Sequence, residues 1–239
     1  MKIYYRKNRM NKVIVIFGAG TGLSASVAKL YGQKGYQIAL VSRNKEKLEL
    51  LSKDLSSENA EASIFTADLT DSSQVKSVVS EIYESFGRID ALYYAPNPRD
   101  AFTPANEITT EILKPKIDLY LFGLINVIQE VLPIFRSQQV GTILSVVGGS
   151  AVNGFPYMSG IGPIMAASRN YLQSLHKELL SENIEVGLIT VSAQIENSEN
   201  YKLTKHENNA DFPVVNPDIL AKKLFEVAVD KENLEVFYP

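Results

Sequence analysis

Short apolar runs alternate with stretches of helical periodicity along nearly the whole chain. The runs are rich in Val, Ile and Leu without polar alternation, which is typical of parallel strands covered on both faces. Strands are expected at 13–17, 37–41, 62–67, 89–94, 141–147, 184–191 and 234–238, and helices at 23–31, 44–55, 72–86, 107–137, 161–180 and 217–229. This alternation predicts an α/β fold with a doubly wound parallel sheet in three α/β/α layers.

Prolines and capping residues indicate where several of these helices begin and end. Ser72 is the expected N-cap of the helix that follows it, and Pro217 stands at the first position of the last helix. Because proline removes a backbone donor, the long helix over 107–137 is expected to be interrupted at Pro115 and closed after Pro133.

The chain is long enough, at 239 residues with 45% hydrophobic content, to bury one large core. We expect a single domain over residues 12–239. Residues 1–11 are basic but lack the apolar region of a signal peptide, so they are interpreted as a leader or an alternative start. The polar connection at 192–213 is longer than compact domains usually contain, which favours a substrate lid, with plain disorder as the alternative.

Composition excludes several classes of function. The net charge is −3 and no basic stretch follows the first ten residues, which argues against nucleic acid or a membrane surface as a partner. The chain has no cysteine, and its histidines are His176 and His206, so no metal site is expected. No apolar run reaches the roughly 18 residues of a transmembrane helix. A soluble, cytoplasmic protein is expected, with a structural role for His176.

A glycine-rich turn follows the first strand directly. Gly18, Gly20 and Gly22 stand between that strand and a helix that begins at Leu23. A pyrophosphate group can reach backbone N–H groups at a helix N-terminus only where no side chain intervenes, and the helix dipole adds to the attraction. The turn therefore indicates a dinucleotide site. The spacing matches G-x-G-x-x-G only loosely, and a glycine-rich connection without a ligand is the alternative.

The order of these and further motifs resembles the short-chain dehydrogenase/reductase family over residues 12–238. The resemblance rests on the glycine turn, with Ser24 in place of the third family glycine, and on Asp68-Leu69-Thr70, Arg88 to Leu92, Gly141 to Leu144 and the two long helices. It implies a Rossmann fold, a nicotinamide cofactor, and oxidoreductase activity on a carbonyl or alcohol. It also implies a homodimer or homotetramer in which the two long helices pair across a two-fold axis.

The residues after the second strand bear on the choice of cofactor. An acidic residue there would bind the ribose hydroxyls of NAD. This chain has Ser42, Arg43 and Asn44 instead, and an arginine can pair with a 2′-phosphate, so NADP(H) is preferred and NAD(H) remains possible. An exposed arginine at a helix start is the alternative. The expected cofactor contacts are Gly18, Gly20, Thr21, Gly22, Leu23, Ser42, Arg43, Asn44, Asp68, Leu69, Ala95 and Pro96.

The catalytic positions implied by the resemblance are altered. The family motif Tyr-x-x-x-Lys falls on Met165 and Arg169, and the family asparagine falls on Tyr120. Methionine can neither donate nor accept the proton that the tyrosine exchanges. Ser150 is the hydroxyl nearest to the family serine position, and Arg169 keeps a charge that could hold the nicotinamide ribose.

Two other tyrosines lie where a substitute proton donor could be sought. Tyr157 lies between Ser150 and the helix of Met165 and is a candidate substitute acid, although an ordinary loop tyrosine is the alternative. Tyr201 and Lys205 match Tyr-x-x-x-Lys literally, but one such match is expected by chance in this composition.

The sequence leaves two main hypotheses. One is an atypical NADP(H)-dependent oxidoreductase that acts on an unknown small carbonyl or alcohol substrate. The other is a non-catalytic NADP(H)-binding sensor or regulatory protein, and a fold used only for assembly ranks last. The two main hypotheses share every cofactor residue and differ only at Tyr120, Ser150, Met165 and Arg169.

Overall fold

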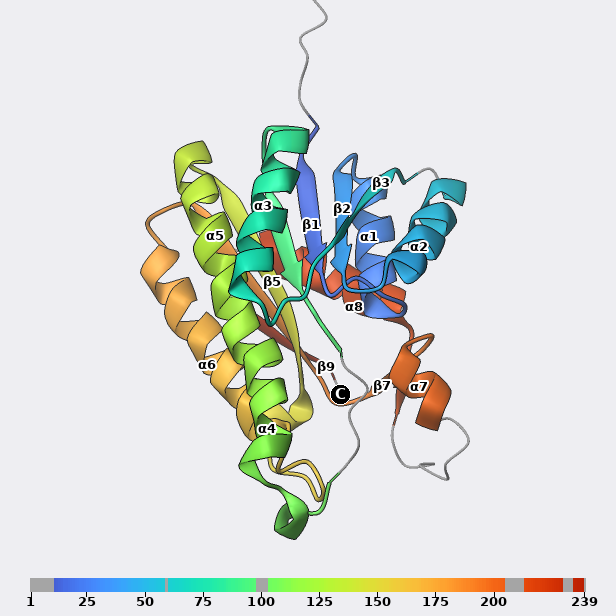
Figure 1. Ribbon diagram of the computed structural model, residues 1–239, viewed down its shortest axis with the longest axis vertical. Coiled ribbons are helices and arrows are strands. Elements are labelled where there is room, and N and C mark those ends of the chain that lie inside the picture. The colour runs from blue at the N-terminus through green and yellow to red at the C-terminus, as the bar shows by residue number, and fades with distance from the viewer. Residues whose placement is uncertain (1–10, 59, 98–102, 205–212, 230–233, 239) are drawn as a thin grey trace, which may run out of the picture.

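A computed structural model of the chain describes residues 11–58, 60–97, 103–204, 213–229 and 234–238 (Figure 1). Seven parallel strands form one sheet in the order β3-β2-β1-β4-β5-β6-β9. They are β1 Val13–Phe17, β2 Gln37–Ser42, β3 Ala62–Thr66, β4 Ala91–Tyr94, β5 Gly141–Gly148, β6 Ile184–Val191 and β9 Glu235–Tyr238. The predicted doubly wound sheet is confirmed. Its strand order reverses between β1 and β4, where a ligand crevice opens in folds of this kind.

Helices cover both faces of the sheet, as the three-layer prediction requires. One face packs against α3, α5 and α6, and the other against α1, α2 and α8. Their bounds are α1 Leu23–Gln33, α2 Lys45–Ser57, α3 Ser72–Phe86, α5 Gly123–Gln138, α6 Gly162–Leu179 and α8 Pro217–Val229. Each face of the sheet has its own hydrophobic core, and alternate residues of β1 point into the two cores. Val15 belongs to the core on the α3, α5 and α6 side, and Ile16 belongs to the core on the other side. Both faces of β1 are therefore buried, which explains why the strand is apolar throughout.

Pro115 does not interrupt the long helical segment, so the break expected there is wrong, whereas the expected end after Pro133 agrees with the end of α5 at Gln138. Helix α4, Thr110–Ile117, contains Pro115 and continues through a π turn, Asp118–Phe122, into α5, which contains Pro133. Each proline removes only one backbone donor. In α5 the residues Val131 and Phe135 are fully buried on either side of Pro133, and their packing outweighs the missing hydrogen bond.

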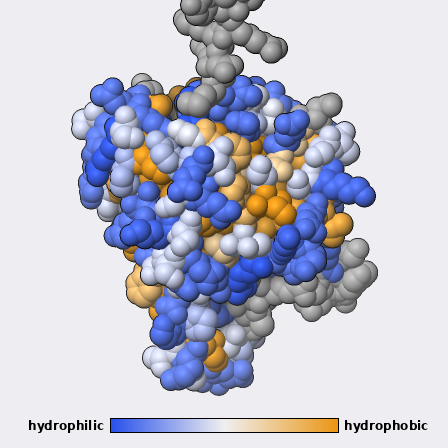
Figure 2. Space-filling view, turned by 45° about the horizontal axis from the view of Figure 1, so that its top comes forward, coloured by the Kyte–Doolittle hydropathy of each residue, from blue (hydrophilic) through white to orange (hydrophobic). Residues whose placement is uncertain are grey.

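The long helical segment that contains α4 and α5 is apolar over much of its length. Within the described residues, Thr110–Gln138 is long and apolar enough to cross a membrane on those criteria alone. The fold gives another reason for this composition, because α5 buries Leu124, Val127 and Ile128 against the sheet. On the face seen in Figure 2, apolar residues gather near the centre and polar residues surround them.

The connection after β6 contains short elements that the sequence did not predict. Strand β7, Gln194–Ile195, pairs with β8, Val214–Val215, and helix α7 spans Glu199–Thr204. Short 3-10 turns also occur at Ala105–Glu107 and Gly149–Ala151. Residues 1–10 and 205–212, which include part of the expected lid, lie outside the described residues.

The N-cap of α3 is Asp71 rather than the expected Ser72. The Asp71 carboxylate accepts hydrogen bonds from the backbone N–H groups of Ser73 and Gln74, at 2.9 and 3.3 Å, and from both side chains. These bonds, led by that from the Ser73 hydroxyl, lower the pKa of Asp71 from 3.8 to about 2. The carboxylate form is therefore the form that the folded state favours.

Replacing Asp71 by asparagine is expected to lower the melting temperature at neutral pH but not near pH 2. The lowered pKa means that the charge contributes stability above pH 3.8, and that this contribution is lost as the pH falls toward about 2. Asparagine keeps a capping oxygen without the charge. Thermal denaturation followed by circular dichroism at both pH values measures the effect, with Ser72→Ala as the control that should not change the melting temperature. Equal losses at both pH values would contradict this role of the charge.

Candidate functional site

The glycine turn is held between the end of β2 and the segment after β4. The backbone N–H groups of Gly18 and Ala19 both donate to the Val41 carbonyl, at 2.9 Å. Gly18 has φ +84°, and a Cβ added to it would lie 2.4 Å from the Cα and N atoms of Pro96. Glycine is therefore required at this position both by the backbone conformation and by the close approach of Pro96.

Gly20 leaves the turn before α1 accessible to a ligand. A Cβ added to Gly20 would meet nothing within 4 Å, and Gly22 caps α1 at φ +73° without a side-chain hydrogen bond. Thr21 is exposed, whereas Leu23 is buried and anchors the first turn. Ser24 donates to the Gly18 carbonyl at 3.5 Å, so it adds a contact across the turn. The first amides of α1 thus fit the approach of a pyrophosphate.

The residues expected around the adenosine lie at the ends of β2 and β3. Ser42 is the last residue of β2, and Arg43 is exposed, with its Nη1 atom 3.9 Å from Oδ2 of Asp68. Asn44 is already occupied as a helix cap, since its side chain accepts from the Lys47 N–H at 2.8 Å.

Asp68 is held in place by its own turn. Its Oδ1 atom accepts from the backbone N–H and the hydroxyl of Thr70, at 2.9 and 2.8 Å. The next residue, Leu69, is buried, and its carbonyl lies 2.7 Å from the position of a Cβ added to Gly123. This turn therefore holds the Asp68 carboxylate beside Arg43, and the Arg43 guanidinium stays exposed to solvent.

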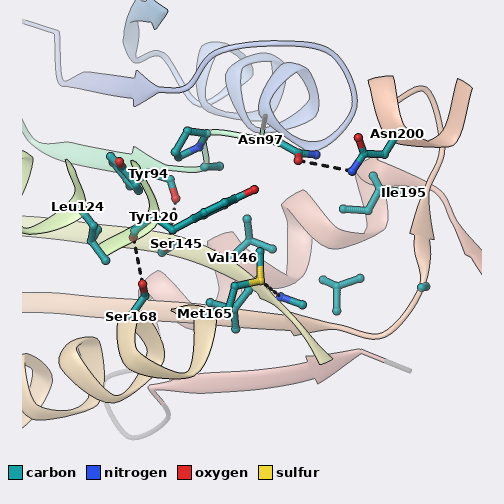
Figure 3. A pocket seen from close by; sticks show the side chains of 16 residues that line it. Tyr94, Asn97, Tyr120, Leu124, Ser145, Val146, Met165, Ser168, Ile195 and Asn200 are labelled. Atoms are coloured by element: carbon teal, nitrogen blue, oxygen red, sulfur yellow. Dashed lines mark hydrogen bonds between the residues drawn. The ribbon is translucent and has the colours of Figure 1, made fainter. Parts of the chain in front are cut away.

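A cavity of about 210 Å³ lies beyond the glycine turn, at the carboxyl ends of β4, β5 and β6 (Figure 3). Four residues expected at the site line it, namely Ala95, Pro96, Tyr120 and Met165. Among the described residues of the lining, none is an Asp, Glu, Lys, Arg or His. The cavity is therefore suited to an uncharged group.

Met165 faces a glycine rather than a serine. Its Sδ atom lies 3.2 Å from the backbone N of Gly148, the last residue of β5. Ser150 lies in the short 3-10 turn that follows β5, and it is not part of the cavity lining. A Cβ added to Gly148 would lie 3.5 Å from both the Met165 sulfur and the Ser150 hydroxyl, so Ser150 is close to this point but separated from the cavity.

Arg169 is engaged with Glu235 of β9. Its Nε and Nη2 atoms lie 2.8 and 2.7 Å from the two carboxylate oxygens, and Thr190 donates to the same carboxylate at 2.5 Å. Glu235 is almost fully buried, with 8% of its side chain exposed. This hydrogen-bonded pair raises the pKa of Arg169. The charge expected to hold a ribose is thus paired at the β6–β9 edge, and Arg169 does not line the cavity.

The alternative tyrosines are not brought to the cavity. Tyr157 is 60% exposed at φ +65°, its carbonyl accepts from the Thr103 N–H at 3.1 Å, and it is not part of the lining. Its role as an acid stays a prediction without support from this geometry. Tyr201 lies in α7, whereas Lys205 and His206 are outside the described residues. His176 is half-buried in the last turn of α6.

Several lining residues were not recognised from the sequence. Tyr94 is the last residue of β4, and its hydroxyl donates to the Leu119 carbonyl. Burial is the main cause that raises the pKa of Tyr94. Ser145 and Ser168 are buried polar residues that donate to backbone carbonyls in the wall. A polar residue inside an apolar strand, as at Ser145, was the signal that could have identified one of them.

The segment after β6 reaches back over the glycine turn. A Cβ added to Gly22 would lie 3.0 Å from Cβ of Ser198. Glu199 lies 3.4 Å from the Lys47 ammonium of α2, and Asn200 donates to Asn97 at 3.4 Å. These contacts join the segment to both sides of the crevice, as a lid requires. Its lid function stays a prediction.

Comparisons with known proteins agree with the fold. A family profile described as short chain dehydrogenase matches residues 12–200. An uncharacterised oxidoreductase of Listeria monocytogenes is 28% identical over 193 residues, covering 79% of this chain and 76% of the relative. A 3-oxoacyl-acyl-carrier-protein reductase of Thermotoga maritima is 28% identical over 179 residues, covering 74% and 72%.

Solved structures share the fold at lower identity. A variant of actinorhodin polyketide ketoreductase with NADPH superposes with a TM-score of 0.85 at 17% identity, covering 95% of both chains. An alcohol dehydrogenase from Thermococcus sibiricus, complexed with 5-hydroxy-NADP, has a TM-score of 0.79 at 19% identity, also covering 95% of both. At this identity the likeness establishes the arrangement of the elements.

Proposed function

Because this chain belongs to the short-chain dehydrogenase family, we propose that it is an NADP(H)-dependent oxidoreductase acting on a small, uncharged carbonyl or alcohol. The observation that carries the proposal is the open backbone at Gly20, at the uncapped start of α1. At Gly20 the backbone is open to the approach of a pyrophosphate, whereas Ser198 lies close to Gly22. Pro96 borders both this turn and the cavity, so one extended ligand can reach from the first to the second.

The cofactor, when bound, supplies or accepts a hydride. The chain's own residues bind and orient it. The first amides of α1 would hold the pyrophosphate, Asp68 and Leu69 would border the adenine, and Ala95 and Pro96 would lie along the path to the cavity. Since the described lining carries no ionised side chain at neutral pH, a neutral substrate loses least by entering it.

The preference for NADP(H) rests on Arg43. Its side chain is 66% exposed at the end of β2, and its 3.9 Å contact with Asp68 is too long for a strong ion pair. A 2′-phosphate could replace that contact with charge-assisted hydrogen bonds. Two solved structures of the same fold contain NADPH and an NADP derivative, which supports the same choice.

A second candidate function is supported by the altered catalytic positions. Met165 carries no proton to transfer, and Arg169 is paired with Glu235. These two observations favour the NADP(H) sensor or regulator without turnover. Assembly as a homodimer or homotetramer and a cytoplasmic location are further proposals that rest on the family resemblance.

Replacing Arg43 by alanine is expected to weaken NADPH binding by about 10- to 100-fold, because a hydrogen bond to a charged group contributes about 1.5–3 kcal/mol. NADH binding should stay nearly unchanged, since NADH lacks the 2′-phosphate. Calorimetry with both nucleotides measures this difference. Lys45→Ala is the matched control, because Lys45 is an equally exposed cation two residues away, with an i,i+4 partner of its own in Glu49.

The same protein should then be tested for oxidation of NADPH with a panel of small ketones and aldehydes. Binding with turnover supports the oxidoreductase, and binding without turnover favours the sensor. Failure to bind either nucleotide would overturn both. Equal loss of NADPH and NADH affinity in Arg43→Ala would remove the role of the 2′-phosphate.

A further inference from the structure

Strand β5 extends beyond its neighbour β4 at the edge of the cavity. Tyr94, the last residue of β4, pairs with Ser145, and β5 continues to Gly148. The chain after β4 turns toward β1, because the Ala95 N–H donates to the Phe17 carbonyl at 3.0 Å. On its β4 side, the end of β5 therefore borders the cavity.

The backbone N–H group of Gly148 points to this side of β5. Successive N–H groups of a strand are directed alternately toward its two neighbours. The Thr142 N–H donates to the carbonyl of Asp90, just before β4, at 3.0 Å. Every second N–H after Thr142, up to that of Gly148, therefore faces β4 or the space beyond its end. Gly148 is accordingly part of the cavity lining.

The group that this N–H contacts in the structure is a weak acceptor. The Sδ atom of Met165 lies 3.2 Å from the Gly148 nitrogen, and the dashed line at Met165 in Figure 3 marks this contact. A thioether sulfur accepts hydrogen bonds only weakly, and the unbranched methionine side chain can move aside. An amide donor in this cavity therefore gains more from a carbonyl oxygen than from the sulfur.

Two hydroxyl groups of the lining are less available to a substrate. Ser145 donates to the Tyr94 carbonyl at 2.9 Å, and Ser168 donates to the Tyr120 carbonyl at 3.0 Å. A hydroxyl that turned to a substrate would take a hydrogen bond away from a backbone carbonyl in the wall, which is costly. When the Gly148 N–H turns to a substrate, only a sulfur loses its contact.

We infer that the Gly148 N–H binds and polarises the carbonyl oxygen of the substrate after displacing the Met165 sulfur, a role that rests on the proposed oxidoreductase function. In the reduction the carbonyl π bond breaks, and a C–H bond forms with the hydride supplied by the reduced nicotinamide, which is oxidised. The Gly148 N–H keeps its own proton and stabilises the negative charge that develops on the oxygen. A proton from a water molecule then forms the O–H bond of the alcohol, and the hydroxide passes to the solvent.

Ketones and the oxidised cofactor test this inference, because together they allow binding without turnover. Protein with isotopically labelled glycine nitrogen is titrated with acetone and with cyclohexanone in the presence of NADP⁺, and the amide resonances are followed by NMR. The Gly148 resonance should shift as its partner changes from sulfur to oxygen, whereas that of Gly35, in the open turn before β2, should not respond. Gly148→Ala identifies the resonance, since the added Cβ would make ordinary contacts at 3.5 Å.

Replacing Met165 by leucine is expected to strengthen ketone binding by about 2- to 10-fold, because the ketone no longer has to displace the sulfur from the Gly148 N–H. Leucine has nearly the volume of methionine, so the shape of the cavity changes little. Met158→Leu is the matched control. Met158 is not part of the cavity lining, and its replacement should leave the ketone affinity unchanged.

The possible results separate this inference from the proposed function. A shifted Gly148 resonance with stronger ketone binding in Met165→Leu supports the inference. If NADP⁺ binds, as seen by calorimetry, but neither ketone shifts the Gly148 resonance, the inference is overturned and the proposed cofactor stays in place. Unchanged ketone affinity in Met165→Leu would overturn the displacement of the sulfur. Absence of NADP⁺ binding would overturn the proposed function and this inference together.

Discussion

Replacing Arg169 by methionine is expected to lower the free energy of unfolding by about 3–5 kcal/mol, the usual cost of removing one partner from a buried ion pair. Glu235 keeps only 8% of its side chain exposed, so the carboxylate left behind cannot recover its hydration. The hydrogen bond from Thr190 remains but does not neutralise the charge. Urea denaturation followed by circular dichroism measures the loss as a lower midpoint.

Two controls distinguish the effect of burying the ion pair on stability from the effect of losing any arginine. Arg136 makes the same two-point contact with Glu182, at 2.7 and 2.9 Å, but on the surface, where 53% of its side chain is exposed. Arg136→Met should therefore cause a much smaller loss. The double variant Arg169→Met with Glu235→Gln removes both charges and keeps an acceptor for Thr190, so it should be more stable than Arg169→Met alone. If Arg169→Met and Arg136→Met were equally stable, burial would not explain the pair.

This pair also changes how the altered catalytic positions are interpreted. From the sequence, Arg169 was expected to take the place of a ribose-binding lysine. The structure shows that a lysine there would lose the two-point contact with Glu235, because an ammonium group is not a planar fork. Introducing Met165→Tyr together with Arg169→Lys would therefore restore a family motif and weaken the β6–β9 edge at once. Met165→Tyr alone is the cleaner variant.

The parts of the fold that the sequence predicted correctly are those whose cause is local. Continuous apolar runs such as Val13–Phe17 can be satisfied only between two layers, so the central strands and the layer order followed from pattern alone. The glycine turn was recognisable for a similar reason. The restrictions that place Gly18, Gly20 and Gly22 act within a few residues of a strand end and a helix start.

The parts that were missed depend on contacts between distant residues. Glu235 lies 66 positions from Arg169, and no periodicity links the two. Ser150 was chosen as the nearest hydroxyl in sequence, yet the β5 residue that meets Met165 is Gly148. The rule that proline breaks a helix failed at Pro115, where α4 continues through the proline to Ile117 and into the π turn.

Alanine at Gly20 is expected to weaken NADPH binding by about tenfold or more while leaving the fold intact. A Cβ there meets nothing within 4 Å, and Gly20 does not need a positive φ, so the free protein tolerates it. In the complex, the methyl group would occupy the space through which a pyrophosphate reaches the backbone amides, and one lost hydrogen bond to a charged group costs about 1.5–3 kcal/mol. Calorimetry gives the affinity, and urea denaturation without nucleotide gives the stability.

Alanine at Gly18 should have the opposite profile, with a loss of stability of about 2–5 kcal/mol before any ligand is added. The left-handed backbone contributes about 1–2 kcal/mol of this and the overlap with Pro96, at 2.4 Å, about 1–3 kcal/mol. Gly35→Ala is the matched control, because Gly35 has nearly the same φ, +83°, and an added Cβ would meet nothing within 4 Å. The difference between Gly18→Ala and Gly35→Ala therefore measures the contact with Pro96.

If Gly18→Ala were no less stable than Gly35→Ala, the turn would not be held against the β4 segment as described. If Gly20→Ala kept full NADPH affinity, the pyrophosphate would not bind at the start of α1. The second result would remove the observation on which the proposed function rests. No contact within the fold requires glycine at position 20, so the open space there is explained by a bound ligand.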